Sequence, residues 1–151
     1  MADTLLIAAP LYKRFAACML DGFLLIALTF PIAVLAGSKD FAIMYSFALN
    51  LCYFSYCHSS IAQATIGKQM LRIIVVDTHG RRLSRRHAVE RGLAYLFPFC
   101  IQFTSLEPKL MASLMVWLIL AWFMPMFFSR QKNGLHDIVC GTRVVQGYIK
   151  G

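Results

Sequence analysis

Charged side chains are scarce in this sequence, and acidic side chains are the scarcest. Only 15% of the 151 residues are charged, and only seven are aspartate or glutamate, whereas about a quarter of a typical soluble domain is charged. Hydrophobic residues make up 59% of the chain, which is above the usual apolar share. This composition excludes an ordinary water-soluble domain and indicates that lipid surrounds much of the chain.

The sequence also lacks features that would divide or cross-link it. No Gly/Ser-rich linker, internal repeat or low-complexity segment interrupts residues 1–151, which predicts a single membrane unit. The five cysteines are an odd number and fall mostly inside apolar runs, where cysteine behaves as a small hydrophobic residue. We therefore expect no disulfide framework.

Motifs for catalysis, metal binding and cofactor binding are missing as well. Gly67 and Lys68 lack the first glycine and the following hydroxyl residue of a phosphate-binding loop. Cys52, Cys57 and His58 have no matching second pair of ligands, and a structural zinc ion needs four convergent ligands. We expect no catalytic residues, no cofactor and no metal site.

Four apolar stretches are present instead, and they predict an all-α membrane protein with four transmembrane helices. They cover residues 15–36, 41–57, 90–106 and 110–128, and about 20 residues cross a hydrocarbon core of about 30 Å. A cleaved signal peptide is the competing interpretation of the first stretch, which is disfavoured by its length and by Asp21 inside it. The third stretch is short and contains Pro98, so snorkelling of Arg91 is expected to supply the missing length.

The basic residues predict the orientation of these helices. Thirteen of the 15 lysines and arginines fall at the N-terminus, in a central loop that ends near Arg91, or in a tail at residues 129–151. This positive-inside pattern predicts a cytoplasmic loop at residues 59–89 and two cytoplasmic termini. If the third stretch were only re-entrant, the asymmetry would fall to nine charges against six.

The central loop contains a β-prone run at residues 71–76, followed by Asp77 and Gly80 at the first and fourth positions of a type I turn. This pattern predicts a small cytoplasmic β-hairpin on the membrane surface. Residues 142–146 form a second β-prone run that could add to it.

A cluster of basic residues follows the turn, namely Arg81, Arg82, Arg85 and Arg86. Each such charge contributes about 1 kcal/mol near an anionic leaflet, so we expect contacts with lipid headgroups. Nucleic acid is not an expected partner, because no aromatic residues alternate with these charges.

Arg14 and Asp21 are ionisable residues in or beside the first apolar stretch, where a charge costs about 2.5 to 3.5 kcal/mol. On a helix they lie about 10 Å apart, so each needs another partner. Asp137 follows the last stretch on the same side of the membrane and is the best candidate to meet Arg14. Asp21 is expected to be protonated, or to bond to a backbone group or water at a helix interface. Asn50 is interpreted as an interhelical hydrogen-bonding residue in preference to a transport residue.

Several segments together resemble the bacterial RDD family, which is named for one arginine and two aspartates. The matching segments are residues 13–17, 20–21, 65–68, 72–77, 80, 134–137 and 141–145. The family's three residues map onto Arg14, Asp21 and Asp137. The resemblance implies a small multi-span protein of the bacterial cytoplasmic membrane, and it implies little about activity, although some members are linked to cation/proton exchange.

Two functions remain open at this point. In the first, the protein is a structural or accessory membrane protein in which Arg14, Asp21 and Asp137 form a polar clamp. In the second, it transports an ion or small solute with Asp21 as the intramembrane carboxylate. His136, Asn50 and Lys68 are secondary candidate residues. The expected partners are membrane lipids and either a second copy or another membrane protein.

Overall fold

The computed structural model describes residues 7–129 and 132–147, which form a mostly helical fold with one small sheet. The elements in chain order are α1 (Leu11–Leu35), α2 (Lys39–Ser59), α3 (Ile66–Met70), β1 (Ile73–Asp77), α4 (Arg85–Leu96), the 3₁₀ helix η1 (Phe97–Phe103), α5 (Pro108–Phe123), α6 (Pro125–Phe128), α7 (Leu135–Val139) and β2 (Thr142–Gln146).

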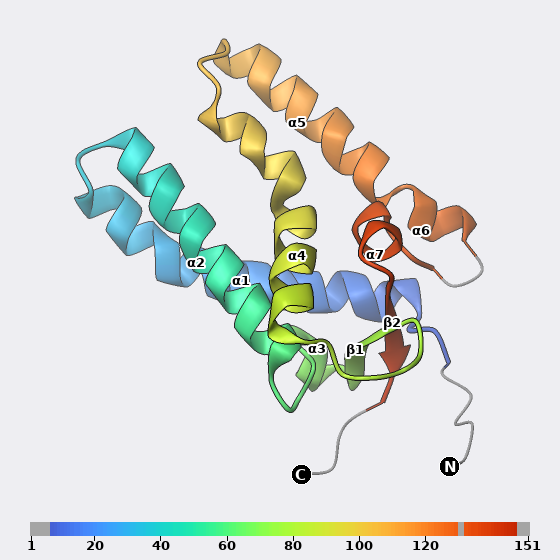
Figure 1. Ribbon diagram of the computed structural model, residues 1–151. Helices are drawn as coiled ribbons and strands as arrows, with labels where there is room; N and C mark the ends of the chain where they lie inside the picture. The colour runs from blue at the N-terminus through green and yellow to red at the C-terminus, as the bar shows by residue number, and fades with distance from the viewer. Residues whose placement is uncertain (1–6, 130–131, 148–151) are drawn as a thin grey trace.

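Two pairs of consecutive helices extend from the sheet, as Figure 1 shows. One pair is α1 with α2, the other is α4 and η1 with α5, and α2 packs against α4. The turns that join the members of each pair lie away from the sheet (Figure 1). Ser38 and Glu107 cap the helices that follow these turns, because their side-chain oxygens accept hydrogen bonds from backbone N–H groups three residues later.

Two helical segments among the described residues are long and apolar enough to cross a membrane. They are Leu11–Leu35, with 25 residues, and Pro108–Phe128, with 21 residues. The second segment presents its large side chains, including Trp117 and Phe127, to the outside of the molecule. Exposing so many large apolar side chains is favourable in contact with lipid, whereas exposing them to water would cost free energy. Residues 7–129 and 132–147 thus contain two candidate membrane spans, as expected for the first and fourth apolar stretches.

The third apolar stretch, residues 90–106, is not one continuous α-helix. The α-helix ends at Leu96, and the 3₁₀ helix Phe97–Phe103 continues the path. Pro98 explains the change, because proline has no N–H for the α-helical hydrogen bond. From Gly92 onward the two parts rise about 22 Å, which is less than the hydrocarbon thickness. The snorkelling expected of Arg91 is also wrong, since this residue is only 1% exposed inside the protein.

The sheet joins the central loop to the C-terminal tail. Strands β1 and β2 pair antiparallel, with Val75 opposite Val144 and Asp77 opposite Thr142. The predicted turn is present, because the N–H of Gly80 donates to the carbonyl of Asp77 at 3.1 Å. The predicted local hairpin is wrong, since residues 81–84 lack β-branched side chains and lead into α4, whereas β2 supplies Thr142 and two valines.

The N-terminal segment before α1 lies along the other edge of β2. The N–H of Ala9 donates to the carbonyl of Val144 at 3.0 Å, and that of Gln146 donates to the carbonyl of Ile7 at 2.9 Å. A buried cluster packs beneath these strands and against α1; it consists of Ala9, Ala17, Ile73, Val75, Leu83, Ala88 and Val144. This packing brings the beginning of α1 next to the tail, which sets the geometry of the polar site.

Candidate functional site

Asp137 is the centre of a buried group of charges, which we call the Asp137 cluster: Arg14, Arg91, His136, Asp137 and Thr142. One carboxylate oxygen of Asp137 pairs with Arg14 and the other pairs with Arg91. These side chains come from α1, α4 and α7 and are at most 7% exposed. The predicted contact between Arg14 and Asp137 is therefore confirmed, and the structure adds a second arginine that the sequence interpretation placed elsewhere.

Further hydrogen bonds fix the orientation of this cluster. The N–H of Gly134 donates to Asp137 Oδ2 at 3.2 Å, and Arg91 Nε donates to Thr142 Oγ1 at 2.9 Å. Arg14 also donates to the backbone carbonyl of Lys132. Burial alone would raise the pKa of Asp137, but the guanidinium groups of Arg91 and Arg14 hold it well below its ordinary value. Asp137 is therefore ionised and tied to three segments.

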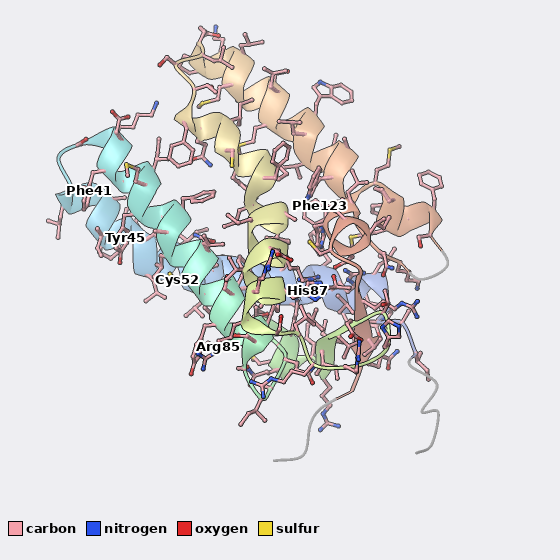
Figure 2. The ribbon with its side chains drawn as sticks, viewed as in Figure 1. Phe41, Tyr45, Cys52, Arg85, His87 and Phe123 are labelled. Carbon is pink, nitrogen blue, oxygen red and sulfur yellow. The ribbon has the colours of Figure 1, made fainter. Side chains whose placement is uncertain are left out.

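His136 lies beside Asp137 in an aromatic environment. Its Nε2 is 3.4 Å from Asp137 Oδ1, and its ring packs edge-on against Tyr95 and Phe123 at centroid distances of 5.2 and 5.4 Å. Figure 2 labels Phe123 near the end of α5 that approaches α7. Burial lowers the pKa of His136 to about 3, so its imidazole is neutral at physiological pH.

The stability of the protein should fall as the pH is lowered from 7 to 5, and His136 should cause part of this fall. The unfolded imidazole binds a proton below its ordinary pKa of 6.5, whereas the folded one stays neutral until about pH 3. The stability that the neutral His136 contributes is thus fully present above about pH 6.5 and is lost as the pH falls from 6.5 towards 3. Thermal unfolding in detergent should show a shallower pH dependence for His136→Gln than for the unsubstituted protein.

His79→Gln is the matched control, because the His79 side chain is 72% exposed. This variant should keep the full pH dependence. Equal slopes for His136→Gln and the unsubstituted protein would contradict the assigned role of His136.

Asp21 forms a separate buried site and receives three hydrogen bonds. Tyr53 Oη and the N–H of Gly67 donate to Oδ1 at 2.7 and 2.8 Å, and Thr65 Oγ1 donates to Oδ2 at 2.5 Å. Asp21 is 3% exposed. The prediction that Arg14 and Asp21 have separate partners is confirmed, and a backbone group is among the partners of Asp21. These bonds connect α1 to α2 and α3.

Gly67 is required by the close approach of α3 to α1. A Cβ atom at this position would lie 2.4 Å from the carbonyl oxygen of Ala17 and 3.0 Å from Asp21 Oδ1. Only glycine lets its N–H reach the Asp21 carboxylate without moving the backbone. The role of Gly67 is therefore to allow close packing of α3 against α1.

Lys68 lies next to Gly67 on α3, and its Nζ is 3.0 Å from His58 Nε2 at the end of α2. Burial lowers the pKa of Lys68 to about 7. At neutral pH this amine is therefore divided between its charged and neutral forms. Lys68 and Asp137 do not share a hydrogen bond or an ion pair in the described part of the chain.

Asn50 does not form the predicted interhelical hydrogen bond. Its Nδ2 donates to the carbonyl of Ser46, one turn earlier on the same helix, at 2.8 Å. This part of α2 lines a cavity of about 290 Å³ together with α1, α4 and η1, and Asn50 and Asp21 are both among the lining residues. The cavity explains why Asn50 has no partner on a facing helix among residues 7–129 and 132–147.

The basic residues of the central loop are exposed at the end of the molecule that contains the sheet. Arg81 Nε pairs with Asp77 at 3.0 Å, Arg86 Nε pairs with Glu90 at 3.0 Å, and Arg82 donates to the carbonyl of Ser59. Arg85, the first residue of α4, is also exposed. Figure 2 shows it near the C-terminal end of α2, far from Phe41 at the N-terminal end of that helix. These residues do not take part in either buried site.

Sequence reasoning missed Arg91, Tyr53, Thr65 and Gly67 as site residues. Arg91 carried a signal that could have identified it, since it stands at the edge of an apolar stretch as Arg14 does. Thr65 and Gly67 lie in one of the segments that resemble the RDD family, but a hydroxyl group and a backbone N–H carry no signal of this role in a sequence. Tyr53 had no distinguishing signal, because an aromatic residue in an apolar helix is ordinary.

The described residues combine two candidate membrane-spanning helices with two buried polar sites, and comparison with known families identifies the class. The RDD family model matches residues 8–141, so the chain belongs to the RDD family. The chain is similar to the uncharacterised protein YxaI of Bacillus subtilis strain 168, with 30% identity over 97 residues. That match covers 64% of this chain and 52% of YxaI, so it spans about half the length of that relative. No solved structure matches the chain.

Proposed function

We propose that this protein crosses the bacterial cytoplasmic membrane four times, with both termini in the cytoplasm. The two membrane-length segments, Leu11–Leu35 and Pro108–Phe128, support the first and fourth spans. The other two proposed spans are α2 and the path of α4 followed by η1, and both belong to the same two helical pairs (Figure 1). Counted from Arg85, the 12 residues of α4 and the seven of η1 rise about 32 Å together. Thirteen of 15 basic residues then lie on the cytoplasmic side.

The proposed role is structural or accessory, without catalytic activity. The observation that carries this proposal is that both buried carboxylates are already engaged by the protein. Asp137 pairs with Arg14 and Arg91, and Asp21 accepts three hydrogen bonds. In this role the two sites fasten the sheet, α3 and α7 to the membrane helices as one cytoplasmic cap.

The exposed loop cations are proposed to hold this cap against anionic lipid headgroups. Arg85 is exposed, and the ion pairs of Arg81 and Arg86 are also on the surface. Exposed pairs of this kind are weak, so lipid phosphates can compete for the same guanidinium groups. A second copy or another membrane protein is the proposed partner of the apolar outer helices.

Reporter fusions after residues 80, 107 and 151 test the topology. A cytoplasmic reporter should be active after residues 80 and 151, and an exported reporter should be active after residue 107, because the basic loops stay inside. Export of the reporter fused after residue 151 would contradict four spans.

Transport measurements test the role. Purified protein in proteoliposomes with a pH gradient should produce no more ion flux than empty vesicles, because both carboxylates are held in place by groups of the protein. Flux that depends on protein would reject the structural role.

A second candidate function is ion or proton transport through Asp21. The observation in its favour is that Asp21 lines the cavity between α1, α2, α4 and η1. In this case Asp21→Asn should abolish the flux while the protein keeps its folded yield, because the exchanging carboxylate is lost. A lower folded yield with no flux in either protein would support the structural role.

A further inference from the structure

The cavity of about 290 Å³ combines an aromatic lining with one carboxylate. Phe47, Phe54, Tyr95, Phe99 and Phe103 line it together with Asp21. Aromatic rings carry a negative electrostatic face that attracts cations within about 6 Å of the ring centre. The remaining lining is mainly apolar and includes a few neutral polar side chains, among them Asn50 and Gln102.

Asp21 differs from Asp137 in the groups that donate hydrogen bonds to it. In the described part of the chain Asp137 pairs with two guanidinium groups, whereas Asp21 forms no ion pair. The donors to Asp21 are two hydroxyl groups and one backbone N–H. They fill three of the roughly four acceptor positions of a carboxylate, and none of them carries a charge. A carboxylate that lines a cavity without an ion pair can accept a cation there, since an opposite charge nearby is what makes a buried charge favourable.

The size of the cavity and its lining select the kind of cation. Its volume is roughly ten times the 30 Å³ that one water molecule occupies in the liquid. A bare metal cation is much smaller, and hard metal ions require about six oxygen ligands. A mainly apolar lining does not supply such a shell, but it fits a cation that carries its own hydrocarbon surface.

We propose that this cavity binds a small lipophilic organic cation, a quaternary or protonated amine with about ten non-hydrogen atoms. Its positive charge lies beside Asp21, and its apolar part packs against the aromatic residues of α2, α4 and η1. Binding of this kind needs neither ion flux nor catalysis, so it goes beyond the structural role proposed above.

Benzyltrimethylammonium is a suitable probe, because its carbon isostere neopentylbenzene has the same shape without the charge. The full-length protein in zwitterionic nanodiscs should bind the cation saturably in isothermal titration calorimetry. Neopentylbenzene should not displace it. Asp21→Asn should weaken binding about tenfold or more, because the charge partner is lost.

Phe47→Leu provides a second test that does not depend on the folding of an Asp21 variant. It keeps an apolar residue on α2 but removes one aromatic ring, and it should weaken binding by about threefold to tenfold. Phe41→Leu is the matched control, since Phe41 lies on the same helix, is exposed and does not line the cavity (Figure 2). This control should bind like the unsubstituted protein.

Four results would overturn the proposal. The first two are the absence of saturable binding to the folded protein and equal competition by neopentylbenzene. The third is that sodium chloride displaces the probe as well as the chloride salt of the probe does at the same ionic strength. The fourth is an unchanged affinity in Phe47→Leu. Equal competition would reassign the cavity to neutral apolar molecules, and displacement by sodium would reassign it to inorganic cations.

Discussion

Replacing Asp137 with asparagine should lower the free energy of unfolding by about 3 to 5 kcal/mol, the range observed when one partner of a buried ion pair is removed. The substitution leaves Arg14 and Arg91 without the carboxylate that they share, although both remain in the interior. Asparagine keeps the size of the side chain, so the loss reports charge and not volume. Thermal unfolding in detergent and the folded fraction in size-exclusion chromatography measure the effect.

The matched control for this substitution is Glu90→Gln. Glu90 also pairs with an arginine, but the side chains of Arg86 and Glu90 are 90% and 53% exposed. Exposed pairs on one helix contribute only about 0.3 to 0.5 kcal/mol, so this variant should unfold close to the unsubstituted protein. If Asp137→Asn is as stable as Glu90→Gln, the Asp137 cluster does not hold the tail in place.

Replacing Gly67 with alanine should also be strongly destabilising, by about 1 to 3 kcal/mol or more. The new Cβ would lie 2.4 Å from a backbone oxygen of Ala17, which cannot rotate away as a side chain can. Helix α3 must then move away from α1, and the hydrogen bond from the N–H of Gly67 to Asp21 lengthens or breaks. Unfolding curves measure the loss, and hydrogen exchange at the amide of residue 67 reports the broken bond directly.

Gly22→Ala is the control for the change from glycine to alanine. Gly22 lies on α1 next to Asp21, and a Cβ there would meet no atom within 4 Å. Because alanine favours helix more than glycine does, this variant should lose no stability. Equal losses in the two variants would show that close packing at Gly67 is not the cause.

The sequence was sufficient for the contact between Arg14 and Asp137, and the reason is topological. A charge at the edge of an apolar stretch costs free energy unless it has a partner. The distribution of basic residues among the loops places Arg14 and Asp137 on the same side of the membrane, so each can be the partner of the other. The same reasoning could not assign Arg91 to Asp137. A basic residue at the beginning of a span is expected at the surface, and only the packing of α4 against α7 turns it inward.

The partners of Asp21 and the partner of β1 show why the rest could not be predicted. The donors to Asp21 come from α2 and α3, and neutral hydroxyl and backbone groups carry no pattern that marks them in a sequence. For β1 the local turn was read correctly, but the strand pairs with residues 142–146. Turn chemistry specifies where the chain reverses, whereas strand pairing depends on which β-prone segment the helices bring near.

Because β1 pairs with β2, the sheet can form only after residues 142–146 have been synthesised. The segment that contains Lys132, Asp137 and β2 leaves the ribosome after Leu11–Leu35 and Pro108–Phe128, the two membrane-length segments among the described residues, have been made. Until then a nascent chain holds Arg14, Arg91 and one edge of β1 without their native partners. A chain without residues 132–146 would therefore expose two unmatched guanidinium groups and an unpaired strand edge, which are the features that make incompletely folded chains prone to aggregate.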